Sequence, residues 1–268
     1  MQILLQSRDN PRLKEIQKLL KSAKYRAQTS AFVIEGARLC EDAFISGVQI
    51  KSLFATADFQ SRFPALFQNI QTVADETCLL TDGLLKTVSD TKTPQGILCV
   101  CKMPQAQRLA LCRGSYIALE TLQDPSNMGT VFRTAEALGI NGALLSADCC
   151  DVYSPKVIRG SMGAVFRLPI MTVQDFPAYI NALRQKGAVV LGAVPDRSVK
   201  NITRISFLEK KPYILLIGNE GAGLTQRALS CCSDLVTIPM PGKAESLNAA
   251  VAASILMWEM VRGRRSAQ

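Results

Sequence analysis

The stretch IPMPGKAESLNAAVAASILMW, residues 238 to 258, decides the fold of this chain. It places a polar tight turn between an apolar strand that ends at Ile238 and an unusually apolar helix. Two prolines and Gly242 force an irregular exit from the strand, and Ser246 is expected to cap the helix that follows. The turn either holds a ligand or only caps a core helix, and this stretch alone favours neither interpretation.

The segment LQDPSNMGTVFRTAEALGI, residues 122 to 140, repeats this arrangement of strand, polar turn and helix. An apolar run at residues 116 to 119 precedes it and predicts a short buried strand. We expect the helix to begin at Asn127 or Gly129 and to carry Arg133. A second arrangement of this kind favours the ligand-binding interpretation.

The segment YILLIGNEGAGL, residues 213 to 224, is a third example, with a glycine-rich turn and a helix expected to begin near Thr225. Turns of this type often cradle a phosphate group. Here no Lys-Ser/Thr pair follows the glycines, and Glu220 would repel an anion. A cationic or neutral ligand therefore fits this turn better.

Taken in order, the three segments resemble the three motifs of the SpoU (TrmH) family of RNA ribose 2′-O-methyltransferases. The segment SMGAVFRLP, residues 161 to 169, is also similar to that family. The likeness is close over residues 114 to 265 and looser over residues 1 to 102. The residues that carry it are Asn127, Gly129, Arg133, Ala137 and Gly139, then Gly218, Glu220, Gly221, Gly223 and Leu224, and then Ile238, Pro239, Met240, Gly242, Ser246, Leu247 and Asn248.

The resemblance implies a SPOUT fold, an α/β fold with a parallel sheet and a C-terminal trefoil knot that forms an S-adenosylmethionine site. General rules of chain topology would not have predicted a knot. The implied domains are a small ribosomal-protein-like α/β substrate-binding domain at residues 1–105, a linker at residues 106–113 and a SPOUT methyltransferase domain at residues 114–268. Within the first domain, FVIEGARLCEDA, residues 32 to 43, carries the likeness.

Apolar runs separated by turn residues predict alternating strands and helices in both domains, which is typical of a sheet with covered faces. In the first domain we expect strands at residues 32–35, 50–55 and 96–100 and helices at residues 37–46, 59–67 and 76–86. In the second domain we expect strands at residues 116–119, 143–145, 189–192, 213–217 and 235–238.

The site residues are also implied by the resemblance. Asn127 and Glu220 are expected to shape the acceptor side, with Glu220 orienting Arg133 or the loop rather than acting as a base. Ser246 and Asn248 are expected to contact the substrate ribose and the methyl-bearing end of the cofactor. Turn capping and core packing remain the alternative roles. The expected catalytic residues are Asn127, Arg133, Glu220, Ser246 and Asn248, and the expected cofactor-binding residues are Ala193, Gly218, Ile238 and Leu247.

The implied reaction needs no metal, because the methyl group of a sulfonium donor is already activated. The protein must hold the ribose hydroxyl in line with that methyl group and stabilise the charge that develops on oxygen. Arg133 is a poor proton acceptor, since the pKa of an arginine lies above about 12. We interpret it as a cation for the RNA phosphate and the developing alkoxide, and a surface arginine on an amphipathic helix is the alternative.

The net charge of +9 and the isoelectric point near 9.2 favour a polyanionic partner, and RNA is the expected one. Seven basic residues against two acidic ones lie between residues 7 and 30. An Asn-Pro pair predicts the start of a helix there, and Leu13, Ile16 and Leu20 predict an apolar stripe that leaves the cations facing water. A merely soluble helix surface is the alternative.

The chain has no histidine, which excludes a Ser-His-Asp triad, a Cys-His pair and any histidine-ligated metal. Its nine cysteines show no CxxC spacing, so we expect core residues in a reducing cytosol. A metal pair at Cys99 and Cys101 is conceivable, but no second pair of ligands completes it. We find no leader and no apolar run long enough to cross a bilayer, and we expect a cytoplasmic protein.

The sequence therefore predicts an S-adenosylmethionine-dependent RNA 2′-O-methyltransferase that acts on ribosomal RNA. A tRNA 2′-O-methyltransferase is one alternative, and a catalytically silent RNA-binding ribosome-assembly protein is another. The presence of all five expected catalytic residues argues against the silent protein. The helix expected from Leu247 to Met260 is apolar nearly all round, and we expect a homodimer that covers it through the C-terminal domain.

Overall fold

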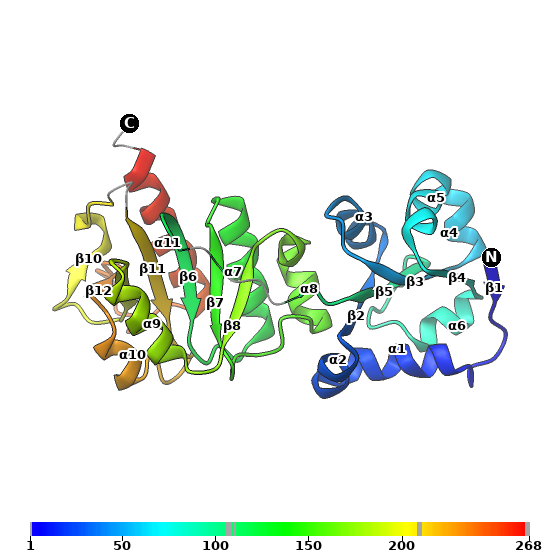
Figure 1. Ribbon diagram of the computed structural model, residues 1–268, viewed down its shortest axis with the longest axis horizontal. Helices are drawn as coiled ribbons and strands as arrows, with labels where there is room; N and C mark the ends of the chain where they lie inside the picture. The colour runs from blue at the N-terminus through cyan, green and yellow to red at the C-terminus, as the bar shows by residue number, and fades with distance from the viewer. Residues whose placement is uncertain (1, 106–108, 110, 208–210, 266–268) are drawn as a thin grey trace. The chain divides into compact units, whose positions relative to one another are not determined.

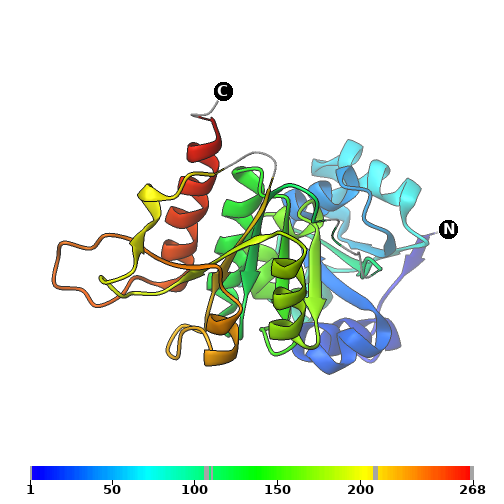
Figure 2. The same cartoon turned by 60° about the vertical axis from the view of Figure 1, so that its left-hand side comes forward.

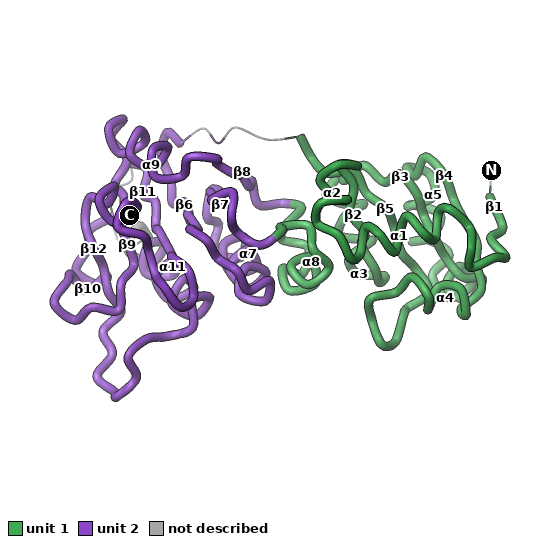
Figure 3. The backbone as a smooth tube through the Cα atoms, turned by 90° about the horizontal axis from the view of Figure 1, so that it is seen from below, with its two compact units in different colours: residues 1–105, 151–166 green, residues 106–150, 167–268 purple. Residues whose placement is uncertain are grey.

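The computed structural model describes residues 2–105, 109, 111–207 and 211–265, with side chains described as far as residue 262. These residues fall into two compact units, which Figure 3 colours separately. Unit 1 comprises residues 1–105 and 151–166, and unit 2 comprises residues 106–150 and 167–268. The domain limits expected from the sequence stay a prediction, whereas the packing of residues 151–166 with unit 1 was not expected.

Unit 1 is built on a five-stranded mixed sheet, shown with its helices in Figure 1. In sheet order the strands are β1 (Gln2–Leu4), β4 (Glu76–Leu79), β3 (Ile50–Ala55), β5 (Ile97–Lys102) and β2 (Ala31–Glu35). β5 runs antiparallel to both of its neighbours, whereas β1, β4 and β3 are parallel to one another. The helices are α1 (Pro11–Lys21), α2 (Ala23–Thr29), α3 (Ala37–Ile45), α4 (Ala57–Arg62), α5 (Pro64–Val73), α6 (Asp82–Thr87) and α8 (Pro155–Ser161), with a short 3₁₀ turn η1 (Ala164–Phe166).

Helix α1 begins as the sequence predicts, with an asparagine cap followed by Pro11. Its buried stripe consists of Leu13, Ile16 and Leu19. The stripe predicted from the sequence is therefore wrong at Leu20, which is only partly buried. A step of three residues after Ile16 keeps the helical period in line with the sheet beneath, and Leu20 lies on the shoulder of that face.

Two other segments of unit 1 differ from the expectation. The helix expected at residues 59–67 is split into α4 and α5, because Pro64 disfavours helical backbone at Phe63, which has φ −130° and ψ 56°. The helix expected at residues 76–86 begins instead as strand β4, which pairs with β3. Only its second half is helical, where Thr81 caps α6.

Unit 2 contains a seven-stranded sheet in which every pairing is parallel. All five expected strands are confirmed to within two residues at each end, whereas the short strands β8 and β10 were missed. Every residue of the central strands β6 and β11 is buried, as their continuous apolar sequences predict. In sheet order the strands are β10 (Lys200–Asn201), β12 (Asp234–Thr237), β9 (Val189–Ala193), β11 (Pro212–Ile217), β6 (Gly114–Leu119), β7 (Gly142–Ser146) and β8 (Ile170–Val173).

Helices cover both faces of this sheet. The helices of unit 2 are α7 (Pro125–Ala137), α9 (Phe176–Gln185), α10 (Gln226–Ser230) and α11 (Ala249–Arg265), with a 3₁₀ turn η2 (Ile202–Arg204). Phe176 and Ile180 of α9 pack with Ala228 of α10 on one face. Helices α7 and α11 contact each other on the other face.

The parallel sheet brings the carboxyl ends of its strands to one edge. Loops follow β6, β9, β11 and β12 at this edge, and Figure 2 shows the long loop at residues 238–248 beside the loop after β9. A hydrogen bond of 3.0 Å from Arg197 Nη2 to the carbonyl oxygen of Gly242 joins these two loops. In open α/β sheets this edge is where ligands bind.

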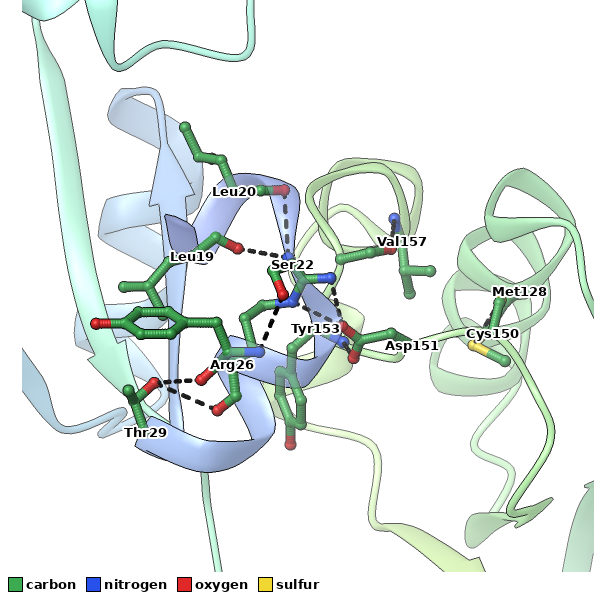
Figure 4. A network of polar contacts seen from close by, with 12 residues as sticks. Leu19, Leu20, Ser22, Arg26, Thr29, Met128, Cys150, Asp151, Tyr153 and Val157 are labelled. Atoms are coloured by element: carbon green, nitrogen blue, oxygen red, sulfur yellow. Dashed lines mark hydrogen bonds and ion pairs between the residues drawn. The ribbon is translucent and has the colours of Figure 1, made fainter. Parts of the chain in front are cut away.

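Residues 151–166 pack on the strand β2 side of unit 1. The rings of Phe32 and Tyr153 have centroids 4.8 Å apart. Arg26, with a relative exposure of 4%, pairs with Asp151 at 2.6 Å and also donates to two carbonyl groups near the end of α1 (Figure 4). Arg26 is therefore not one of the cations that the sequence predicted to face water.

Candidate active site

A cavity of about 210 Å³ lies at the carboxyl edge of the unit 2 sheet. The ends of β9, β11 and β12 and the start of α11 supply its walls. No lysine or arginine lines it. All four residues expected to contact a cofactor line this cavity, namely Ala193, Gly218, Ile238 and Leu247. Glu220 and Ser246 line it as well.

The glycine-rich loop after β11 is folded tightly on itself. Asn219 and Gly223 exchange two backbone hydrogen bonds of 3.0 Å, and the Asn219 side chain accepts from the N–H groups of Gly221 and Ala222. A Cβ atom on Gly218 would lie 2.1 Å from the backbone of Gly223, so no side chain fits at Gly218. The glycines therefore give this wall of the cavity a fixed backbone surface.

A chain of side-chain hydrogen bonds joins the three sequence motifs. Asn248 Nδ2 donates to Asn127 Oδ1 at 2.9 Å, and Asn127 Nδ2 donates to Glu220 Oε1 at 3.1 Å. These residues lie at the start of α11, in the first turn of α7 and in the loop after β11. The structure thus brings together three of the five expected catalytic residues.

Asn248, rather than Ser246, caps α11. Its Oδ1 accepts from the N–H groups of Ala250 and Val251 at 2.9 and 3.2 Å. The cap predicted at Ser246 is therefore wrong, and this serine is exposed at the cavity wall two residues earlier. One amide side chain both starts α11 and holds Asn127.

The carboxylate of Glu220 is engaged by backbone groups as well as by Asn127. Gln123 N donates to Oε2 at 3.1 Å and Asp124 N donates to Oε1 at 2.8 Å. Partial burial alone would raise the pKa of Glu220, but the hydrogen bonds from these two N–H groups outweigh it and lower the pKa. Glu220 therefore stays ionised at neutral pH and orients the loop after β6.

Arg133 projects from α7 and is exposed. It forms no hydrogen bond or ion pair with any residue that the structure describes, and it does not contact Glu220. Its neighbour along the helix, Glu136, pairs instead with Arg167 at 2.8 Å. Of the two roles that the sequence allowed for Glu220, the structure supports orienting the loop and not orienting Arg133.

Sequence reasoning missed the contribution of the loop before α7. The helix begins at Pro125 with Asp124 as its cap, so the start expected at Asn127 or Gly129 is wrong. The Asp-Pro pair is a helix-start signal that was available in the sequence. The N–H groups that Gln123 and Asp124 offer to Glu220 left no such signal, because the partner lies 96 residues or more away.

Most of the lysines near the N-terminus remain on the surface of unit 1. Lys18, Lys21 and Lys24 are exposed, and Lys18 lies 5.5 Å from the ring centroid of Tyr25. Arg12, by contrast, binds the carboxylate of Glu76 through Nε and Nη2. The exposed cations are therefore a group of lysines on α1 and α2.

The cysteines of unit 1 lie in its core. Cys40, Cys99 and Cys101 are each 0% exposed, and burial raises the pKa of Cys40 and Cys101 well above the ordinary value. In the described part of the chain, no group of three or more Cys, Asp or Glu side chains has the geometry to hold a metal ion. Within the same residues, no helix combines the length and apolar character needed to cross a bilayer.

Two family models match the chain. A model described as the SpoU rRNA methylase family matches residues 114–258, and a model described as an MRM3-like substrate binding domain matches residues 10–99. The first match includes all three motifs of the site. The second falls within unit 1.

Curated relatives match along nearly the whole chain. An uncharacterised tRNA/rRNA methyltransferase of Synechocystis is 32% identical over 96% of this chain and 92% of its own length. The 23S rRNA (guanosine(2553)-2′-O)-methyltransferase of Bacillus subtilis is 31% identical over 96% of this chain and 98% of its own length. A crystal structure of an AdoMet-bound rRNA methyltransferase from Sinorhizobium meliloti is 28% identical, with a TM-score of 0.87 over 100% of this chain and 99% of that one.

Proposed function

We propose a function for this chain from the premise that it belongs to the SpoU rRNA methylase family, as the match over residues 114–258 shows. The function is S-adenosylmethionine-dependent methyl transfer to a ribose 2′-hydroxyl of ribosomal RNA. The observation that carries the proposal is the hydrogen-bonded chain of Asn248, Asn127 and Glu220 at the edge of the cavity. It joins three motifs that are far apart in the sequence at one place.

The cavity fits S-adenosylmethionine in shape and charge. Ile238 and Leu247 offer apolar surface for an adenine ring, and Gly218 offers backbone groups that can bond its edge. The ionised carboxylate of Glu220 at the wall, with no lysine or arginine among the lining residues, favours a cationic ligand over an anionic one. When bound, this donor supplies a methyl group that is already activated by its sulfonium charge.

The chain's own residues then act on the acceptor. Asn127 is fixed between Asn248 and Glu220, so it can present its amide to the ribose without losing orientation. Arg133 is a free cation that binds an RNA phosphate and stabilises the alkoxide as the hydroxyl proton leaves. Neither Arg133 nor Glu220 is suited to accept that proton, and the RNA phosphate assists its departure.

The finer features of the fold belong to the same proposal. The C-terminal chain passes through a loop as a trefoil knot, and unit 1 has the ribosomal-protein-like fold. Two observations support the knot: the close approach of Gly218 to Gly223 and the bond from Arg197 to Gly242 between neighbouring loops. Unit 1 supplies RNA contacts through Lys18, Lys21 and Lys24, and the substrate-binding family model over residues 10–99 supports this assignment.

The enzyme is also proposed to be a cytoplasmic homodimer formed through unit 2. An apolar stripe runs along one side of α11 and remains exposed. Its members, with their relative exposures, are Leu247 (37%), Val251 (47%), Ile255 (36%) and Trp258 (49%). Exposed apolar stripes of this kind mark interaction sites, and a second copy offers a matching stripe.

Calorimetry with S-adenosylmethionine, followed by transfer of a labelled methyl group to purified rRNA and tRNA, tests the proposal. We expect saturable cofactor binding and label in the ribose of rRNA. Label in tRNA alone would favour a tRNA 2′-O-methyltransferase. Absence of cofactor binding would favour a silent RNA-binding ribosome-assembly protein.

A further inference from the structure

Thr121 has a backbone conformation that none of the roles above explains. It lies two residues after the end of β6 and has φ 55°, in the left-handed region where a β-branched residue is an outlier. Two other described residues with side chains share this region, Ser30 and Met162. Each of those ends a helix, where left-handed backbone is common, but Thr121 ends none. Strain of this kind gathers at functional sites.

All the polar atoms of Thr121 have partners. Its N–H donates to Ser146 Oγ at 2.8 Å, and its Oγ1 donates to Asp148 Oδ2 at 2.8 Å. Its carbonyl oxygen accepts from Asn219 Nδ2 at 2.9 Å. Ser146 Oγ also donates to Asp148 Oδ1, so one carboxylate holds both hydroxyl groups. These bonds hold the left-handed conformation in place.

The turn after β7 grips the rest of the same loop. Cys150 N donates to the carbonyl oxygen of Leu122 at 2.8 Å, and Gln123 Nε2 donates to the carbonyl oxygen of Asp148 at 2.6 Å. The opposite side of the loop offers the N–H groups of Gln123 and Asp124 to Glu220. The loop therefore connects Asp148 on one side to Glu220 on the other.

We propose that Asp148 and Thr121 are positioning residues for methyl transfer. They set the backbone of residues 121–124 so that its N–H groups hold Glu220, and Glu220 in turn holds Asn127. Neither residue lines the cavity or touches the cofactor side of the site. The inference rests on the proposed function only because methyl transfer is its readout.

A merely structural role for Asp148 would make a different prediction. If the carboxylate only stabilised the turn after β7, its loss would lower the melting temperature and leave turnover of the folded protein unchanged. If it positions Glu220, its loss lowers kcat while the KM for S-adenosylmethionine changes little, because the acceptor side is disturbed. Catalysis and stability are therefore measured on the same variants.

The test compares Asp148→Ala, Asp148→Asn and Thr121→Ser with wild type. For Asp148→Ala we expect kcat to fall roughly 10- to 100-fold, the scale of loss that a misplacement of about 1 Å produces. An amide has one acceptor oxygen for two hydroxyl groups, so Asp148→Asn, which keeps the shape and folds, should lose less. Thr121→Ser keeps the hydroxyl group and should stay near wild type.

Asp175→Ala is the matched control. Asp175 caps α9 by accepting from Ala178 N, as Asp148 accepts from its own partners, but it lies outside the site. We expect this variant to lose stability and keep its kcat. A fall in kcat for Asp175→Ala as large as that for Asp148→Ala would overturn the inference.

A double-mutant cycle separates action through Glu220 from an independent effect. In a Glu220→Gln background, we expect Asp148→Ala to add little further loss, because both changes act on one loop. Fully additive losses, or an unchanged kcat for Asp148→Ala, would overturn the inference. If wild type itself transferred no methyl group under these conditions, the proposed function would fail instead, which is a distinct result.

Discussion

Glu220 is a negatively charged residue whose work is done through hydrogen bonds that it accepts. Three N–H donors, from Gln123, Asp124 and Asn127, converge on its two oxygens. A carboxylate held in this way is a weak proton acceptor at neutral pH, because accepting a proton would disrupt these bonds. Its contribution to the reaction is the orientation of Asn127.

The pKa of Glu220 gives a testable pH dependence. Its pKa in the folded protein lies below the ordinary value of 4.5, so the ionised form favours folding. The stability that it contributes is fully present above pH 4.5 and is lost as the pH falls through the folded pKa. We expect the difference in free energy of unfolding between wild type and Glu220→Gln to be constant near neutral pH and to shrink in acid. Denaturant titrations at several pH values measure it, and a difference that grows in acid would contradict this assignment.

Arg133 allows the sharpest test of catalysis by a single residue. We expect Arg133→Ala to lower kcat by roughly 10²- to 10³-fold, as when one oxyanion donor is removed, while cofactor affinity stays unchanged. Arg133→Lys should recover only part of the loss, because a point charge lacks the planar fork that grips phosphate. Arg227→Ala, which removes an exposed arginine of α10, is the control. Wild-type turnover in Arg133→Ala would refute the role.

At the scale of elements, α1 and α2 carry the charge that we assign to RNA. Substituting Lys18, Lys21 and Lys24 by Gln should weaken RNA binding and lower the slope of log K against log salt by roughly 2, at about 0.7 for each phosphate contact. The melting temperature should hardly change, since these side chains are exposed.

A control triple variant carries Lys51→Gln, Arg62→Gln and Lys102→Gln, which remove the same charge elsewhere on unit 1. Filter binding at several salt concentrations compares the two. Equal slopes for both triple variants would show that net charge, and not the lysine group on α1 and α2, governs binding.

The strands at the centre of the unit 2 sheet were predictable because burial on both faces writes a continuous apolar run, as in β6 and β11. Strand β4 was not, because four residues give no periodicity, and its strand character comes from pairing with β3 and β1. The same limit explains the missed β1, β8 and β10. Short strands are specified by their neighbours more than by their own sequence.

The site divides in the same way. Residue types at the starts of α7 and α11 indicated caps and turns, and family resemblance assigned their roles. The contact between Asn127 and Asn248 joins residues 121 apart in sequence, which no local pattern reports. Ser246 and Asn248 are both good cap residues, and the structure selects Asn248, whose amide also reaches Asn127. The left-handed backbone at Thr121 had no signal, because threonine is disfavoured there.

For the whole molecule, the interleaved chain of unit 1 determines how it can be dissected. Residues 151–166 lie within the SpoU family match, yet they pack against Phe32 and Arg26. Removing residues 1–105 would leave the carboxylate of Asp151 without its buried partner and would expose apolar residues of α8. Point variants of the full chain therefore test RNA binding better than truncation.

The apolar stripe on α11 makes a prediction about assembly. We expect wild type to sediment with twice the 29.2 kDa mass of one chain. Ile255→Glu with Trp258→Glu should yield folded monomers, because burying two carboxylates in the interface is costly. Ile45→Glu, at a 73% exposed apolar residue of unit 1, is the control and should leave the mass unchanged. A wild-type mass equal to one chain at micromolar concentration would refute the dimer.

The most direct measurement is a ribose-methylation map of rRNA from cells with and without the gene. We expect one or a few 2′-O-methyl marks to disappear when the gene is deleted. They should return with the wild-type gene but not with Arg133→Ala, expressed to the same level. Identical rRNA maps with and without the gene, or full restoration by Arg133→Ala, would contradict assignment of this chain as an rRNA 2′-O-methyltransferase that acts through Arg133.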